Sequence, residues 1–208
     1  SNCWPCSRTR WWCLITLREY QIEVLPDLPR TEPPPVVGDL LSEWPIWPSE
    51  IEEQVRLTAQ EYQLYMNPIF GTDQRHLRMD KASPCILHSY GSILEACPCG
   101  CRSYPLSPHR LERDGARGFF VQSSTDQQMR YLTAQEAAFL LTMPTGTKYA
   151  SEKFGLSLLG QCAAPAQALW VVAHLLRGVG LLDDPGRYLR LWLMGVLRSF
   201  SSVVRFPQ

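Results

Sequence analysis

Three cysteines at alternate positions are the residues in this sequence best suited to bind a metal. Cys97, Cys99 and Cys101 stand in the run Cys-Pro-Cys-Gly-Cys-Arg, whose proline and glycine favour a tight loop. A fourth ligand for Zn²⁺ could come from any of three nearby metal-binding side chains: His109, His88 or Cys85. Zinc sites usually bring their cysteines in two C-x2-C pairs, a spacing that this run lacks. Two interpretations stay open: a zinc site of the three cysteines with His109, or a tight loop with metal-free thiols.

The arginines just downstream could bind the phosphates of a nucleic acid. They are Arg102, Arg110, Arg113 and Arg117, and two acidic residues stand among them. Because arginine donates charge-assisted hydrogen bonds to phosphate oxygens, this cluster is the best candidate for a DNA-backbone contact in the chain. An ordinary solvated loop explains the same composition. The net charge of zero over the whole chain is unusual for a free-standing nucleic-acid-binding domain.

The composition is that of one globular domain, with room for a small satellite. The chain has 208 residues, of which 45% are hydrophobic and 19% charged, so it can bury a core. Its eight cysteines are unevenly spaced and follow no secretory signal, which indicates reduced thiols in an intracellular protein. No apolar run reaches the roughly 18–20 residues of a spanning helix, so we expect no membrane association. The sequence starts at Ser1 and its first methionine is Met66, so we expect a fragment of a longer polypeptide.

The elements that must position these residues follow from residue type and periodicity. The segment from Arg10 to Glu19 is rich in aromatic and β-branched residues and predicts a strand. The proline-rich stretch from Leu25 to Pro48 predicts an extended surface connection rather than a core element. We expect a helix from Glu50 to Tyr65 and short strands at Ile86–Tyr90 and Phe119–Gln122.

Three helices are expected in the C-terminal part. The helix from Thr133 to Thr142 begins with a capping box, in which Thr133 and Glu136 satisfy each other's N–H groups, and it stops before Pro144. A second helix spans Ala166–Arg177, and a third begins at Asp184-Pro185, a good cap followed by a residue suited to the first turn. Their apolar stripes are expected to pack into the core: Leu169, Val172, Ala173 and Leu176 on one, and Leu189, Trp192, Leu193, Val196 and Phe200 on the other.

An arginine pair near the N-terminus carries the first of three resemblances. The run Pro5-Cys6-Ser7-Arg8-Thr9-Arg10 precedes the Trp-rich strand, and alternation puts Arg8 and Arg10 on one side of the backbone. It resembles motif VIII of the DNA cytosine-5 methyltransferases, with Cys6 in place of the family's glutamine. There, one arginine holds the flipped cytosine by its O2 edge and the other organises the catalytic loop. A surface arginine pair packed on the neighbouring tryptophans is the alternative.

The second and third resemblances follow in the family's order. The run from Arg130 to Leu140 matches motif IX, R-x-L-T-x-x-E-A-A-x-L with a proline a few residues on, which supports the target-recognition region. The run from Leu158 to Pro165 resembles motif X, G-N-x-V-P-P before a helix, with Gln161 in place of asparagine. In the family this turn packs beside S-adenosylmethionine, so the resemblance implies cofactor contacts from Gly160, Gln161 and Cys162.

The resemblance implies an α+β fragment. It would contain edge strands of a Rossmann-like methyltransferase sheet, a small irregular target-recognition region, and C-terminal helices that return to the sheet. Residues 1–20 would hold the motif VIII strand, 21–128 the recognition region, 129–150 motif IX, and 151–208 motif X with the last helices. The implied substrate is DNA, the cofactor S-adenosylmethionine, and the location nuclear if the source is a eukaryote. The implied partner is a missing N-terminal half, which would cover the sheet-facing surface.

The family's chemistry requires residues that this sequence lacks. These enzymes attack cytosine C6 with a thiolate from a Pro-Cys-Gln loop, contact N3 with a glutamate of a Glu-Asn-Val motif, and methylate C5 of a flipped base. The Glu-Asn-Val motif and the Phe-x-Gly-x-Gly cofactor turn are absent, and no Pro-Cys pair is followed by glutamine. We therefore expect the chain alone to be inactive. Two other functions stay open: a non-catalytic relic or regulator that binds DNA or a methyltransferase, and a cysteine-rich zinc or interaction module.

Overall fold

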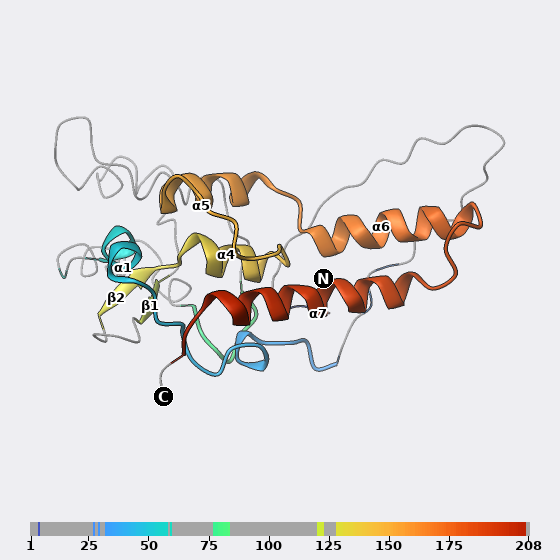
Figure 1. The fold of residues 1–208 in the computed structure, drawn as a ribbon. Coiled ribbons are helices and arrows are strands. Elements are labelled where there is room, and N and C mark those ends of the chain that lie inside the picture. Colours follow the sequence, from blue (N-terminus) through green and yellow to red (C-terminus); the bar gives the residue numbers. More distant parts are fainter. Residues whose placement is uncertain are drawn as a thin grey trace, which may run out of the picture.

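Helices dominate the part of the chain that the structure describes. The computed structural model describes residues 32–57, 77–83, 120–122 and 128–206, together with Trp4, Asp27, Pro29 and Ala59. Along the chain the elements are η1 (Val37–Asp39), α1 (Ser49–Val55), β1 (Phe120–Gln122), β2 (Met129–Tyr131), α4 (Ala134–Leu140), α5 (Glu152–Gln161), α6 (Pro165–Gly178) and α7 (Pro185–Val203) (Figure 1). This part is a small α+β arrangement, and the strands expected at 10–19 and 86–90 lie outside it.

The strand expected at Phe119–Gln122 is confirmed as β1. It pairs with β2 in a two-stranded antiparallel sheet, in a register that sets Val121 opposite Arg130. Val121 is 1% exposed and Arg130 is also 1% exposed, so this pair lies inside the molecule. Within the described ranges β1 and β2 are the only paired strands, and they do not form a Rossmann-like sheet.

The helix expected from Glu50 to Tyr65 is interrupted after Val55, where α1 ends; Ala59 is helical again, and the other residues from 58 to 65 lie outside the described part of the chain. Arg56 is extended, with φ −64° and ψ 140°, and forms an isolated bridge with Arg130 of β2. The N–H of Leu57 then donates to a carbonyl of β2 at 3.1 Å, and the Leu57 side chain is 4% exposed. This pairing satisfies the backbone and buries Leu57, so the tertiary contact overrides the local preference for helix.

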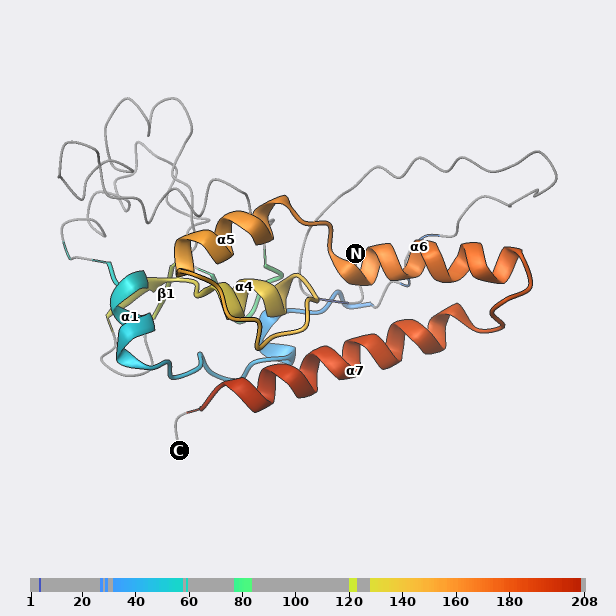
Figure 2. The ribbon, with the colours of Figure 1, turned by 45° about the horizontal axis from the view of Figure 1, so that its top comes forward.

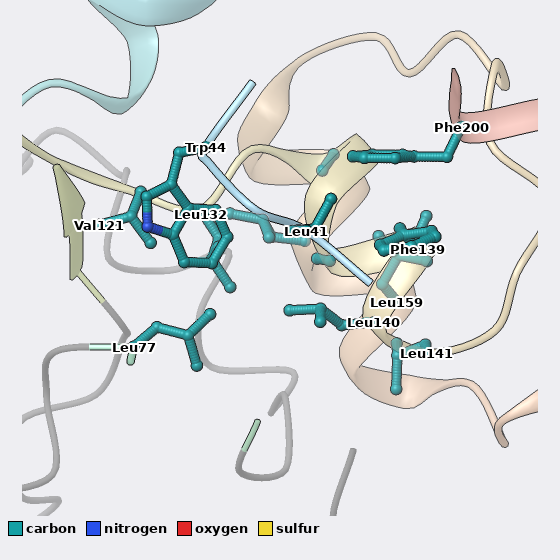
Figure 3. Close-up of a cluster of buried hydrophobic side chains, with 14 of the residues drawn as sticks. Leu41, Trp44, Leu77, Val121, Leu132, Phe139, Leu140, Leu141, Leu159 and Phe200 are labelled. Atoms are coloured by element: carbon teal, nitrogen blue, oxygen red, sulfur yellow. The ribbon is translucent and has the colours of Figure 1, made fainter. Parts of the chain in front are cut away.

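The core is built around α4. Phe139 of α4 stacks on Phe200 of α7 with ring centroids 4.1 Å apart, and it lies edge-on to Trp4 at 5.3 Å. The indole N–H of Trp4 donates to the Phe139 carbonyl at 3.2 Å. Figure 3 shows Phe139 and Phe200 together with Leu41 and Trp44, which come from the chain before α1. Residues far apart in the sequence therefore meet on one short helix.

The prediction of a surface connection over Leu25–Pro48 is wrong for the second half of that segment. Val37, Leu41, Trp44 and Trp47 are all buried. Prolines exclude regular structure but leave the side chains between them free to turn inward. Because two indoles carry a large apolar area, they enter the core without a helix or strand to hold them.

The end of α4 is where the sequence predicts it, before Pro144, but its backbone is unusual. Thr142 has a φ of 62°, a left-handed conformation that β-branched residues rarely adopt. Its Oγ1 accepts the Ala166 N–H at 3.1 Å, and its carbonyl accepts the indole N–H of Trp192 at 2.9 Å. Thr142 therefore ties the end of α4 to the start of α6 and to α7.

α5 is a helix that the sequence analysis does not predict. Ser151 caps it by accepting an N–H of its first turn at 3.2 Å. Gly155 and Gly160 lower the intrinsic helix propensity of this segment, so the sequence alone does not predict a helix here. Gly155 is needed because α5 crosses α4 closely: an added Cβ would lie 2.6 Å from the Ala134 Cβ and 2.8 Å from Cγ of Tyr149.

Replacing Gly155 by alanine is expected to destabilise the protein by about 1–3 kcal/mol, because the new methyl group overpacks the α4–α5 contact. This loss exceeds the ~1 kcal/mol by which alanine favours a helix over glycine. Gly195→Ala on α7 is the matched control, since an added Cβ there meets nothing within 4 Å, and we expect it to stabilise slightly. Urea unfolding of both variants measures the difference, and equal effects would contradict the close α4–α5 crossing.

α6 and α7 form a helical hairpin that projects beyond α4 and α5 (Figures 1 and 2). α7 begins as the sequence predicts: Asp184 accepts the Arg187 N–H at 3.0 Å, and Pro185 stands in the first turn. Its predicted inward stripe is confirmed. Leu189, Val196 and Phe200 are buried, and Trp192 and Leu193 are half-buried.

The predicted core packing of the α6 stripe is wrong for most of its residues. Ala173 is 2% exposed, but Val172 is 49% and Leu176 37% exposed, and Leu169 is half-buried. Within the described residues α6 packs on α7 and buries its smaller side chains, leaving the larger aliphatic ones uncovered. Periodicity identifies an apolar face correctly, but it does not say what covers that face.

One run of helix is apolar enough, by length and composition alone, to cross a membrane. It spans Glu152–Gly178 and therefore joins α5 to α6. The backbone leaves the helical conformation at Cys162, with ψ 150°, and at Ala164, with ψ 121°. The two helices on either side have 10 and 14 residues, each short of the roughly 20 that a span needs. This run is therefore weak support for a membrane segment.

Candidate functional site

A buried ion pair joins β2 to α4 at the centre of the motif IX run. Nη1 of Arg130 donates to Oε2 of Glu136 at 2.8 Å, and Nη2 donates to Oε1 at 2.7 Å. The arginine side chain is 1% exposed and the glutamate side chain 0%. Such a two-pronged pair is the strongest geometry that a guanidinium and a carboxylate can form.

The Glu136 carboxylate is saturated with donors. Its Oε2 also accepts the Thr133 N–H at 2.9 Å, and the Thr133 Oγ1 accepts the Glu136 N–H at 3.2 Å, so the predicted capping box is confirmed. Its Oε1 also accepts the indole N–H of Trp47 at 3.1 Å. Each oxygen of this buried carboxylate therefore accepts two hydrogen bonds.

Two more carboxylates surround the same guanidinium. Oε2 of Glu52, on α1, lies 3.5 Å from Nε of Arg130. Oε2 of Glu152, the first residue of α5, accepts the Ala134 N–H at 2.5 Å. The cluster of Glu52, Arg130, Glu136 and Glu152, here called the buried charge cluster, therefore joins α1, β2, α4 and α5.

Electrostatics within the buried charge cluster move two pKa values. Burial alone lowers the pKa of Arg130, but the charge and hydrogen bonds of Glu136, with further attraction from Glu52 and Glu152, raise it above its ordinary value. Burial raises the pKa of Glu152, and the Glu136 charge adds to this rise; the Ala134 N–H and the Arg130 charge oppose it without cancelling it. Arginine therefore stays charged, whereas Glu152 holds a proton more readily than a free glutamate does.

The buried charge cluster is a structural joint rather than a reaction site. Its residues are at most 8% exposed, so no substrate reaches them. Close to it, a cavity of about 170 Å³ lies between α4 and α7, but its lining side chains carry no titratable group. The role that the geometry supports is structural: the cluster holds α1, β2, α4 and α5 together.

The turn between α5 and α6 carries the residues expected to contact a cofactor. This turn is shorter than predicted, because Leu158 to Gln161 are helical and only the residues from Cys162 to Ala164 separate the helices. Gln161 is exposed, and Cys162 is half-buried with its thiol donating to the Leu158 carbonyl at 3.2 Å. The cofactor contacts stay a prediction.

The other predicted site residues lie outside the part of the chain that the structure describes. These are the motif VIII pair Arg8 and Arg10, the proposed phosphate contacts Arg102, Arg110, Arg113 and Arg117, and the proposed zinc ligands Cys97, Cys99, Cys101 and His109. Within the described ranges, no group of three histidine, cysteine or acidic side chains could hold a metal ion. The zinc site and the DNA contacts stay predictions.

Three partners of the ion pair are not evident from the sequence. Trp47, which bonds Glu136, comes from the segment expected to be a surface connection. Glu52, which faces Arg130, lies near the start of the helix expected from Glu50. Glu152, which bonds the first N–H of α4, lies where no helix is expected. The available signal was the motif IX arginine, since a buried guanidinium requires acidic partners. It identifies the need for such residues but not their positions.

Comparison with known proteins adds no family to this geometry. No protein-family model, no curated protein and no solved structure matches the chain. The function is therefore inferred from the residues and their arrangement.

Proposed function

We propose that this chain is the C-terminal part of a DNA (cytosine-5) methyltransferase, which transfers a methyl group from S-adenosylmethionine to C5 of cytosine. One observation supports this most: Arg130, Thr133 and Glu136, the polar residues of the motif IX pattern, bond to one another in a single buried unit. A capping box needs a threonine and a glutamate but no arginine ahead of it. The match to motif IX therefore includes a buried ion pair between Arg130 and Glu136, which a capped helix alone does not require.

The link between motifs IX and X gives further support. Thr142 at the end of α4 accepts the Ala166 N–H at the start of α6, and Glu152 holds the start of α5 against the first N–H of α4. The far end of α5 and the residue that follows the motif X turn are thus both bonded to the motif IX helix or its end. The resemblance gives motif IX a structural role and places the motif X turn beside the cofactor, and contacts between the two motifs are consistent with one unit.

The proposal gives the remaining residues their roles. Arg8 and Arg10 hold the flipped base, Arg102, Arg110, Arg113 and Arg117 contact the DNA backbone, and Gly160, Gln161 and Cys162 form one wall of the cofactor site. The nucleophile comes from an N-terminal half, either in the same polypeptide or in a separate chain.

The exposed face of the α6–α7 hairpin supports a missing partner. Val172, Leu176, Val179 and Leu181 are between 37% and 74% exposed, and all lie on or just after α6. Water contact with so many neighbouring aliphatic groups is unfavourable, so a face of this kind indicates an interface. In this proposal the N-terminal half covers it.

Methyl transfer by the native polypeptide that contains this sequence tests the proposal. Duplex DNA is incubated with that polypeptide and with S-adenosylmethionine labelled in its methyl group, and the DNA is then digested to nucleosides. We expect label in 5-methylcytosine, and none when the 208-residue chain is used alone. DNA binding without labelled product would favour the non-catalytic alternative, and label in RNA or in another base would refute the assignment.

A further inference from the structure

Glu152 joins three helices through its own atoms. Its carboxylate accepts the Ala134 N–H, the first of α4, at 2.5 Å. Its backbone N–H donates to Oε1 of Gln54 on α1 at 3.3 Å. The residue is itself the first of α5 and is 8% exposed. The carboxyl group of Glu152 thus bonds α5 to α4, and its backbone N–H bonds α5 to α1.

The charges that face Glu152 do not neutralise it. Arg130 of β2 is engaged by both oxygens of Glu136 on α4 and approached by Glu52 on α1. Three carboxylates therefore share one guanidinium, and within the described ranges Glu152 forms no ion pair of its own. The phenol of Tyr149, just before α5, is the other titratable group that Glu152 influences, and it brings no positive charge.

We propose that Glu152 is a proton-linked latch, which holds the start of α5 tightly against α4 when its carboxyl is protonated and loosens it when the carboxyl ionises. An ionised carboxylate here is only partly compensated, because the Arg130 guanidinium that attracts it is already paired with Glu136, whose own charge repels it. A protonated carboxyl keeps an oxygen to accept the Ala134 N–H and removes that charge. Geometry and charge count thus favour the protonated form of the docked helix.

The direction of the pH dependence follows from this arrangement. Burial raises the pKa of Glu152 in the folded protein above its value in the unfolded chain. Folding therefore takes up a proton at this residue, and the stabilisation is fully present below the unfolded pKa and is lost as pH rises through the folded pKa. This is opposite to the behaviour of a salt-bridged carboxylate, which loses stability in acid.

The latch reaches the candidate cofactor turn through α5. Glu152 starts the helix and Gln161 ends it, immediately before the turn at Cys162. Loosening the start of α5 would leave that turn tied to α4 only through the bond between Thr142 and the Ala166 N–H. This consequence, unlike the latch itself, rests on the proposed methyltransferase function.

Hydrogen exchange of the α5 amides, expressed as protection factors so that the chemical pH dependence is removed, tests the latch. We expect protection in the full polypeptide to fall severalfold as pH rises from ~5 to ~8, above the ordinary pKa of glutamate. Glu152→Gln, which keeps the acceptor without the charge, should make protection independent of pH and at least equal to wild type at the upper end. Glu53→Gln, on the exposed face of α1, is the matched control and should behave as wild type.

Either of two results would overturn the latch. One is wild-type protection of α5 that stays constant over this pH range, which decides the matter even if the variant fails to fold. The other is weaker protection in Glu152→Gln at every pH, which would make the ionised carboxylate a stabilising group. Because DNA and S-adenosylmethionine are absent from the experiment, its failure leaves the proposed function untouched.

Discussion

Replacing Arg10 by alanine in the complete enzyme lowers kcat for cytosine methylation by about 100-fold or more, the usual effect of removing one preorganised donor from a reacting group. The proposal places this guanidinium against the O2 edge of the flipped base, where it would hold the ring as C6 is attacked. The proposed role of Arg10 is to hold the base and not to stabilise the fold, so we expect the thermal unfolding midpoint to stay unchanged. Steady-state kinetics and a circular-dichroism melt measure the two quantities.

Arg190→Ala is the control for the Arg10 variant. Its side chain is 71% exposed on α7 and pairs only loosely with Asp184, at 3.5 Å, so its loss removes a surface charge without touching the candidate site. We expect wild-type kinetics from this control. Wild-type turnover in Arg10→Ala would remove the base-holding role and would favour a surface arginine pair packed on the neighbouring tryptophans.

Replacing Arg130 by methionine destabilises the protein by about 3–5 kcal/mol, the usual penalty when one partner of a buried ion pair is removed. Methionine fills a similar volume but removes the guanidinium that pairs with Glu136 and faces Glu52 and Glu152 in the interior. The Glu136 carboxylate retains its bonds to the Thr133 and Trp47 N–H groups, so part of its solvation survives. Guanidinium chloride unfolding gives the change in the free energy of unfolding.

Arg78→Met is the matched control for Arg130→Met. Arg78 also forms a two-pronged pair, with Asp80 at 2.7 Å and 2.5 Å, but its side chain is 54% exposed. Water replaces the lost partner at an exposed site, so we expect a far smaller effect than at Arg130. Similar losses in the two variants would contradict the role of the buried charge cluster as the joint of this fold.

The features that the sequence predicts correctly are those set by neighbouring residues. The capping box at Thr133 and the N-cap at Asp184 each depend on residues within one helical turn. They can therefore be recognised without knowledge of the tertiary structure. The inward stripe of α7 is also correct, because Leu189, Val196 and Phe200 meet a core that a strongly amphipathic helix must bury.

The features that the sequence misses are set by distant residues. α1 ends at Val55 because Leu57 pairs with β2, and nothing in the segment itself signals that strand. α5 escapes prediction because Gly155 resembles a helix breaker, whereas the glycine is required by the approach of Ala134. The same difference holds for the candidate site. The motif IX residues are recognised from a short run of sequence, whereas Glu152 lies 18 residues from Ala134 and contacts it only in the folded protein.

Covalent trapping on DNA that contains 5-fluorodeoxycytidine tests the central claim most directly. In the proposed reaction a thiolate adds to C6 and a methyl group is added at C5, after which loss of the C5 proton releases the enzyme. Fluorine at C5 cannot leave as a proton does, so the bond to C6 persists. The account predicts that the native polypeptide containing this sequence forms a DNA adduct that survives denaturation and requires S-adenosylmethionine. No adduct from a preparation that binds both DNA and S-adenosylmethionine would contradict it.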